Sequence, residues 1–278
     1  MAKTLLAVYQ SSAVANPYYS PDAHRAEKVG DLFAGIAPRY DFINDLQSFG
    51  LHRLWKRRLV RLARVQPGDT ALDLCCGTGD VAFALARAGA QVTGLDFSAP
   101  MLAVAEARKS KVQSPKSKAG ERTNDVIGNR QSAIGNLQFL QGDALRTPFP
   151  DASFDLVTIS YGLRNLASFA GGLQEMWRVA RPGARLLVLD FGKPDNARWR
   201  ALYFTYLRWG VPLFGRVFCR NAPAYAYIHE SLQHYPAQRG VDAQLRELGC
   251  VNLRLVNLLG GVMSLNMGVK PAGERTSG

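Results

Sequence analysis

The feature that most constrains the fold is a short apolar run that ends in a glycine-rich turn and continues as a helix. The run is Ala71–Leu74, the turn has the sequence CCGTGD, and a helix is expected from Val81. Gly77 and Gly79 permit a tight turn, and the free N–H groups at the helix start face whatever the turn encloses. This order is typical of the first unit of a parallel α/β sheet that binds a nucleotide-like ligand.

Strands and helices alternate through the rest of the chain. Further strands are predicted at 90–96, 137–144, 154–162 and 184–192. The last apolar run, 250–270, is broken at two glycines and predicts a hairpin. Alternation of this kind places helices on both faces of a parallel sheet. We therefore predict an α/β fold, namely a Rossmann-like, doubly wound, mostly parallel seven-stranded sheet with an antiparallel C-terminal hairpin.

The chain is long enough for one large α/β domain, and its composition is that of a globular protein. We predict a single domain at 23–270, with a flexible arm at 1–22 and a flexible tail at 271–278. A helix is expected to end near Arg108. The segment 108–136 that follows is polar and basic, with little periodicity, and predicts a disordered insertion. The segment 194–236 is expected to cap the acceptor site.

Three predicted strands end in an aspartate at the same sheet edge. Asp73 can pair with an ammonium group, and together with Asp80 it would repel a pyrophosphate. Asp96 can accept hydrogen bonds from both ribose hydroxyls. Asp143 can accept from an adenine amino group, with Ala144 against the ring. Each aspartate alone is equally typical of a turn or a helix cap, but the set predicts a site for a zwitterionic nucleoside, S-adenosylmethionine.

Two other ligand classes were weighed. With Ala82 the turn also matches G-x-G-x-x-A, which is found in dinucleotide sites. A nicotinamide enzyme needs a hydride-transfer site, however, and no Tyr-x-x-x-Lys pair follows the fourth strand. No metal site is expected either, because the spacing of the cysteines fits neither a metal site nor a disulfide framework. They are Cys75, Cys76, Cys219 and Cys250.

Three blocks resemble the ubiquinone/menaquinone biosynthesis C-methyltransferase family of the S-adenosylmethionine methyltransferase superfamily. YDFINDLQSFGLHRLWK at 40–56 is similar to that family's YDxMNxxxSxGxHxxWK. SYGLRN at 160–165 is similar to SFGLRN, and RVARPGARLLVLDF at 178–191 is similar to RVLKPGGxxxxLEF. The resemblance spans about 28–108 and 137–269, and it leaves the basic insertion unexplained.

The resemblance also assigns cofactor contacts by position. Together with the turn residues Asp73, Gly77 and Gly79, the implied set is Thr78, Asp96, Asp143, Ala144 and Ser160. The chain departs from the family in a few places. Cys75 and Cys76 stand where small residues are usual, so we expect a slightly bulkier turn. Asp190 and Gly192 replace the usual Glu and Ser.

The activity implied by the resemblance is C-methylation of a prenylated quinol, with S-adenosylmethionine as donor. Demethylmenaquinol or demethylphylloquinol is the preferred acceptor, since no ubiquinone-specific feature is visible. The alternatives are the 2-polyprenyl-6-methoxybenzoquinol precursor of ubiquinone and another phenol or lipid. The catalytic candidates are Arg164, Asn165 and Tyr40. A salt bridge is the alternative role for Arg164, ordinary packing for Tyr40, and a helix-start hydrogen bond is favoured over a base role for His52.

The net charge of +12 is concentrated in two segments, 108–136 and 193–220. Neither resembles a nucleic-acid module, although an RNA-binding role for the first was considered. The run at 199–214 mixes aromatic residues with arginine. It predicts an interfacial helix on anionic lipid, a pocket cap or a homodimer face. We expect a cytoplasmic protein, associated through this run with the inner face of a membrane, and no nucleic-acid partner.

Overall fold

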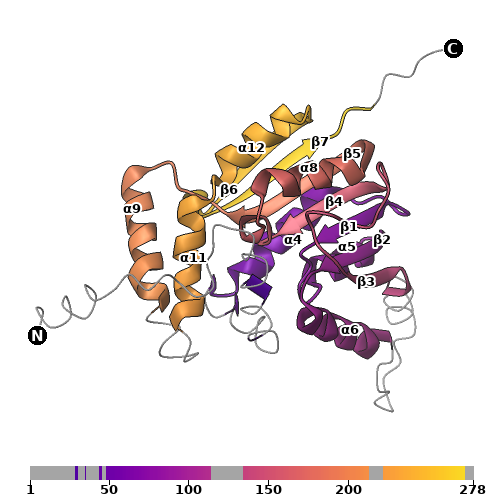
Figure 1. The fold of residues 1–278 in the computed structure, drawn as a ribbon, viewed down its shortest axis with the longest axis horizontal. Helices are drawn as coiled ribbons and strands as arrows, with labels where there is room; N and C mark the ends of the chain where they lie inside the picture. The colour runs from indigo at the N-terminus through magenta and orange to yellow at the C-terminus, as the bar shows by residue number, and fades with distance from the viewer. Residues whose placement is uncertain are drawn as a thin grey trace, which may run out of the picture.

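The computed structural model describes residues 29–30, 35, 44–45, 48–113, 134–212 and 222–272, with the backbone alone for 222–226. Their sheet has the strand order β3-β2-β1-β4-β5-β7-β6 (Figure 1). Strands β1 to β5 pair in parallel, and β7 is antiparallel to both β5 and β6. The predicted fold is therefore confirmed. The strands are β1 Thr70–Leu74, β2 Gln91–Asp96, β3 Leu137–Gln141, β4 Phe154–Ser160, β5 Ala180–Phe191, β6 Val251–Leu258 and β7 Met263–Val269.

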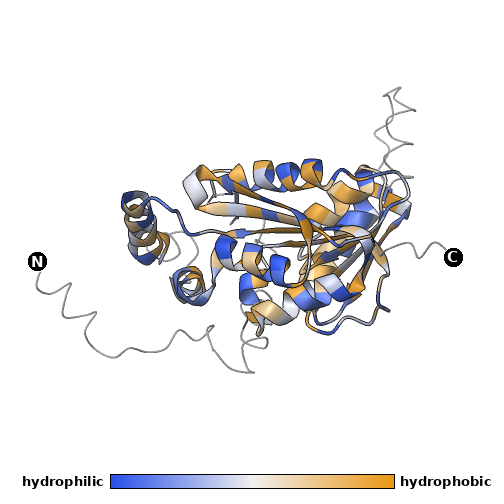
Figure 2. Cartoon of the chain, turned by 90° about the horizontal axis from the view of Figure 1, so that it is seen from above, coloured by the Kyte–Doolittle hydropathy of each residue, from blue (hydrophilic) through white to orange (hydrophobic). Residues whose placement is uncertain are grey.

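Helices cover both faces of the sheet (Figure 2). The α-helices are α4 Leu51–Ala63, α5 Asp80–Arg87, α6 Ala99–Gln113, α8 Phe169–Val179, α9 Ala197–Thr205, α11 Ala222–His234 and α12 Ala237–Glu247. Three short elements are η2 Leu163–Asn165, the π-helical η3 Tyr206–Gly210 and η4 Leu259–Gly261. None of the described helices is long and apolar enough to cross a membrane.

Helix α6 continues to Gln113, beyond the end expected near Arg108. The reason is local, because lysine and glutamine favour helix and no glycine or proline lies between Arg108 and Gln113. The first part of the predicted insertion is thus helical. Of the rest, 114–133 lies outside the described residues, as do the arm at 1–22 and most of the tail. At the far end of the predicted insertion Ile134 is fully buried in the core, so that end is not disordered.

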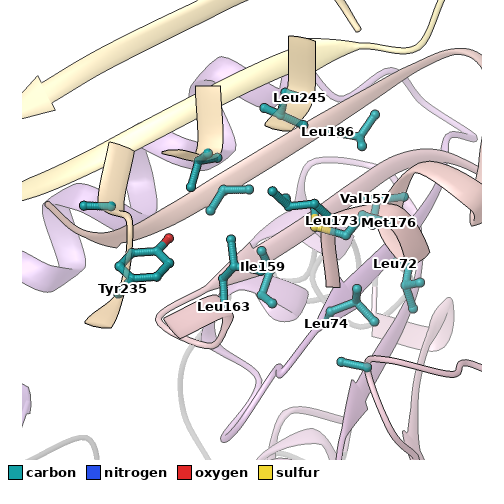
Figure 3. Close-up of a cluster of buried hydrophobic side chains, with 14 of the residues drawn as sticks. Leu72, Leu74, Val157, Ile159, Leu163, Leu173, Met176, Leu186, Tyr235 and Leu245 are labelled. Atoms are coloured by element: carbon teal, nitrogen blue, oxygen red, sulfur yellow. The ribbon is translucent and has the colours of Figure 1, made fainter. Parts of the chain in front are cut away.

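Side-chain alternation along the strands builds two apolar layers. In β1, Leu72 and Leu74 face one layer with residues of α8 and α12, whereas Ala71 faces the other with residues of α4 and α5. Figure 3 shows the first layer, including Leu163 of η2 and Tyr235 at the end of the cap. The turn after β4 is therefore fastened to the core by its own apolar side chain.

The segment predicted to cap the acceptor site, called the cap, contains α9, η3 and α11. Helices α9 and α11 lie side by side at one end of the sheet (Figures 1 and 2), and the Phe204 and His229 rings meet edge to face with centroids 5.9 Å apart. Tyr203, Leu207 and Val211 are buried and join the first apolar layer. Helix α11 also contacts η2, the short helix that follows β4. The cap is thereby connected to the carboxyl edge of the sheet.

Candidate active site

A cleft opens at the carboxyl edge of β1 to β4. Its volume is about 800 Å³, including the space open to solvent at its mouth. This is in the range of sites for cofactors and small molecules. Among the predicted site residues, those that line it are Gly77, Asp96, Asp143, Ala144, Ser160 and Asn165. The strand ends thus meet where the sequence predicted, because parallel strands place their carboxyl ends at one edge.

The turn after β1 and the end of β2 are joined by a carboxylate. Asp96 Oδ2 accepts a hydrogen bond from the Gly77 amide at 2.7 Å, and Oδ1 accepts from the Ser98 amide at 2.9 Å. Burial raises the pKa of Asp96, and these two amides partly offset that effect. Gly77 and Gly79 have φ of 56° and 86°, which explains the need for glycine in this turn. Asp96 is consequently held in one orientation at the cleft.

The cleft also contains polar atoms that suit a nucleoside. The hydroxyls of Ser98 and Ser160 are buried and have no hydrogen-bond partner in the described part of the chain. Asp143 is exposed, and its Oδ1 accepts from the Leu145 amide at 2.8 Å. Ala144 lines the cleft beside it. Buried hydroxyls of this kind need a partner, so the polar lining of the cleft fits a nucleoside such as that of S-adenosylmethionine.

Three predicted cofactor residues do not line the cleft. Thr78 and Gly79 lie in the turn, with the Thr78 side chain buried. Asp73 lies beneath the turn and is 1% exposed. Its Oδ1 accepts a hydrogen bond from the Thr158 hydroxyl at 2.7 Å, and Oδ2 has no partner among the described residues. Burial raises the pKa of Asp73 to about 7. Asp73 therefore supports the turn from below.

Asp80 has a different environment from the one its sequence position suggested. Lys56 Nζ lies 2.8 Å from its Oδ2, and an Arg108 guanidinium nitrogen lies 2.7 Å from its Oδ1. Burial alone would raise the pKa of Asp80, but the two cations outweigh it and lower the pKa. Because Asp80 is matched by two positive charges, it would not repel a pyrophosphate. That part of the case against a dinucleotide was wrong.

The bulkier turn has a direct structural consequence at Cys75. This residue has a φ of 52°, in the region that favours glycine, and it lines the cleft. A Cβ added to Gly162 would lie 2.4 Å from the Cys75 Cβ and 2.8 Å from its Sγ. Cys75 therefore occupies the space beside Gly162, and the turns after β1 and β4 are packed directly on each other.

The η2 turn positions both catalytic candidates that the structure describes. Arg164 is buried, and its Nη1 donates to Asp190 Oδ1 at 3.0 Å and to the Tyr161 carbonyl at 2.6 Å. Its guanidinium carbon lies 4.6 Å from the centroid of the Phe191 ring. The alternative of a salt bridge is thus realised for Arg164, with a partner at the end of β5. Asn165, by contrast, lines the cleft.

The sequence also suggested Tyr40 and His52, and the structure describes only the second of them. Tyr40 lies outside the described residues. His52 is buried near the start of α4, where its Nδ1 lies 2.9 Å from the Ser48 hydroxyl. Burial lowers the pKa of His52. This is the helix-start hydrogen bond that was favoured over a role as base.

Sequence reasoning missed two tyrosines. Tyr161 lines the cleft with a φ of 60°, and it stands where the resembled block has phenylalanine. Its position next to Ser160 in that block was a usable signal. Tyr227, in α11, donates a hydrogen bond from its hydroxyl to Asn165 Oδ1 at 3.0 Å. No spacing could have indicated this contact, since the two residues are far apart in the chain.

The fold and the cleft together define the class of protein. A dinucleotide-binding sheet has its sixth strand parallel beside the fifth, whereas antiparallel β7 takes that place here. The structure is similar to that of an S-adenosylmethionine-dependent methyltransferase of Thermotoga maritima, with a TM-score of 0.56 and 16% identity over 86% of this chain and 99% of that chain. This is the class I methyltransferase fold.

Sequence comparison narrows the class to a family. A model of the ubiE/COQ5 methyltransferase family matches residues 22–270. The ubiquinone/menaquinone biosynthesis C-methyltransferase UbiE of Ectopseudomonas mendocina is 38% identical over 258 residues, covering 90% of this chain and 92% of that protein. The chain therefore belongs to the ubiE/COQ5 methyltransferase family. The [4+2]-cyclase SpnF has a similar fold, with a TM-score of 0.57 and 16% identity over 89% of this chain and 97% of that chain, so likeness of this kind shows the fold alone.

The contact between Cys75 and Gly162 predicts a rescue. Gly162→Ala is expected to lower the free energy of unfolding by about 1–3 kcal/mol, because the new methyl group overlaps Cys75. In a Cys75→Gly background the same change should cost much less, since the overlapping atoms are gone. Urea denaturation of the four proteins measures both values. Gly135→Ala is the control, because its Cβ would meet nothing within 4 Å; equal losses in both backgrounds would contradict the contact.

The buried Asp73 carboxyl predicts a pH dependence of stability. Its folded pKa is about 7, above the unfolded value, so the native state binds more protons between about pH 4 and pH 7. The free energy of unfolding should then fall as pH rises through this window, by about 2 kcal/mol between pH 5 and pH 7 from this group. Urea denaturation at several pH values should show a shallower fall in Asp73→Asn. An unchanged slope would contradict the assignment to Asp73.

Proposed function

We propose that this protein methylates a ring carbon of a prenylated quinol. The observation that carries the proposal is the Asn165 amide, which lines the cleft and is held at both ends. Its Nδ2 donates to the Tyr161 carbonyl at 3.0 Å, and its Oδ1 accepts from Tyr227. A fixed amide donor beside the carboxyl edge of the sheet suits a methyl acceptor that carries a ring hydroxyl. The name of the curated relative, a quinone-biosynthesis C-methyltransferase, supports the same acceptor class.

The chemistry sets what the protein must supply. S-adenosylmethionine, when bound, supplies an electrophilic methyl group on a sulfonium. A quinone ring is electron-poor, but a quinol that has lost one hydroxyl proton carries electron density at the ortho carbon. Positioning that carbon can lower the barrier by about 7 kcal/mol or more. A donor that stabilises the phenolate adds to this, and we assign that role to Asn165.

Arg164 contributes by holding the turn. A guanidinium is permanently charged and is a poor proton acceptor, and that of Arg164 is paired with Asp190. Its bond to the Tyr161 carbonyl fixes the same peptide that Asn165 contacts. We propose that Arg164 positions Asn165, and that Tyr40 remains a candidate for holding or relaying a ring hydroxyl.

Among quinols we favour the naphthoquinol, namely demethylmenaquinol or demethylphylloquinol. The 2-polyprenyl-6-methoxybenzoquinol precursor presents a similar ring edge and is the alternative, followed by another phenol or lipid. No described residue of the cleft selects the fused second ring over the methoxy group. The acceptor is therefore to be decided by direct assay.

Methyl transfer from labelled S-adenosylmethionine tests the proposal. We expect label in chemically reduced demethylmenaquinone, measured anaerobically, and none in the unreduced control, because only the quinol forms a phenolate. Asn165→Ala should lower kcat by about 10²-fold or more without changing cofactor affinity. The control Asn257→Ala, at an exposed position of β6, should leave kcat unchanged. Label in the methoxybenzoquinol alone would move the assignment to that pathway, and label in neither quinol would refute it.

The outer face of the cap supports a second proposal, peripheral contact with anionic lipid. Leu202, Tyr206 and Trp209 are 60%, 46% and 52% exposed, opposite the buried side of the same helix. The segment Ala197–Gly210 has three arginines and no acidic residue. An exposed apolar stripe with basic neighbours is the composition of an interfacial helix. A prenylated acceptor resides in a membrane, so this face would bring the cap to it.

Flotation with vesicles tests the lipid contact. Wild-type protein should float with vesicles rich in phosphatidylglycerol at low salt, and less so at high salt, because screening weakens the attraction of arginine to lipid. Leu202→Asp should reduce flotation severalfold. Leu255→Asp, at an exposed leucine of β6, is the matched control. Equal loss in both variants, or no flotation of the wild type, would contradict the proposal.

A further inference from the structure

The orientation of the Asn165 amide is dictated by its neighbours. The Tyr161 carbonyl can only accept, so the atom 3.0 Å from it must be Nδ2, which leaves Oδ1 facing the Tyr227 hydroxyl. Tyr227 must then be the donor in that bond. Each partner fixes one end of the amide, and the two constraints agree. Exchange of the oxygen and nitrogen would place two acceptors against each other at Tyr161.

Among the described residues, this arrangement leaves one N–H of Nδ2 without a hydrogen-bond partner. One Nδ2 hydrogen goes to Tyr161 and Oδ1 is occupied by Tyr227, whereas Asn165 itself lines the cleft. Tyr227 is 1% exposed and Asn165 7% exposed, so water cannot readily substitute for the tyrosine hydroxyl. Without that hydroxyl, the amide would be held only through Tyr161 and could swing about its side chain.

We infer that Tyr227 is a positioning residue for the reaction. Its hydroxyl, contributed by the cap helix α11, fixes the Asn165 amide so that an N–H of Nδ2 stays available to the cleft as a donor to the quinol phenolate. This inference rests on the proposed function, since it assumes a phenolic acceptor. It also gives the cap a part in the chemistry beyond enclosing the acceptor, because one hydrogen bond connects α11 to the turn after β4.

The chain offers a matched control for this role. Tyr203 belongs to the same cap and is also buried, but its hydroxyl has no hydrogen-bond partner in the described part of the chain. Tyr203→Phe and Tyr227→Phe each remove one buried hydroxyl and leave the ring in place. The two variants differ in whether the lost hydroxyl orients Asn165.

The test is the pH profile of kcat for the wild type, Tyr227→Phe and Tyr203→Phe with reduced quinol under anaerobic conditions. A poorly oriented donor stabilises the phenolate less, so the acid limb of Tyr227→Phe should move to higher pH by about one unit. This equals a tenfold loss of kcat on that limb, with the rates converging at high pH. Cofactor affinity should be unchanged in Tyr227→Phe, and the pH profile of Tyr203→Phe should follow that of the wild type.

Three outcomes would overturn the inference. The first is a loss of kcat in Tyr227→Phe that is equal at every pH, because such a loss indicates disturbed packing. The second is no loss of kcat in Tyr227→Phe. The third is the same shift of the acid limb in Tyr203→Phe. Each of these outcomes can be observed only if the wild type methylates a quinol, so the proposed function stands even when the inference about Tyr227 fails. Failure of the wild type to methylate either quinol overturns the proposed function, and this inference with it.

Discussion

The buried ion pair between Arg164 and Asp190 joins the turn after β4 to the end of β5. Asp190 accepts from the Arg164 backbone amide as well as its guanidinium, and from the Phe191 amide. Removing one member of a buried pair typically costs about 3–5 kcal/mol, because the other charge is left without compensation. The turn after β4, which carries Asn165, is therefore held rigid. Its backbone holds Tyr161 at positive φ, and Leu163 anchors it in the core.

Carboxylates near the cofactor edge are kept in three different electrostatic states. Asp80 is paired with two cations, Asp96 accepts from two backbone amides, and Asp73 is buried and accepts from the Thr158 hydroxyl. These differences decide what each can do. Asp96 faces the cleft as an oriented acceptor, while the charge of Asp80 is already satisfied by the protein. A uniform treatment of aspartates at strand ends would miss this division of roles.

The sequence predicted the fold because the relevant signals are local. The apolar runs, the glycine turn and the final hairpin each lie within one short segment, and parallel pairing then brings the strand ends together. Hence Asp96 and Asp143, which follow predicted strands, lie at one cleft, and Ser160, which the family resemblance implied, lines the same cleft. Side-chain partners were not predictable in the same way. The contacts of Asp73 with Thr158 and of Asn165 with Tyr227 join residues 85 and 62 positions apart, and no local pattern specifies such pairs.

The same limit explains why function must be argued from the site. The fold is shared with the [4+2]-cyclase SpnF, so the sheet alone does not select methyl transfer. Function depends on the residues placed above the carboxyl edge. Here these residues belong to a cap whose inner side reaches Asn165 through Tyr227 and whose outer side exposes Leu202 and Tyr206. Because both sides belong to the same cap, a shift of the cap would change two things at once. It would move the Asn165 amide that lines the cleft, and it would move the exposed surface formed by Leu202 and Tyr206.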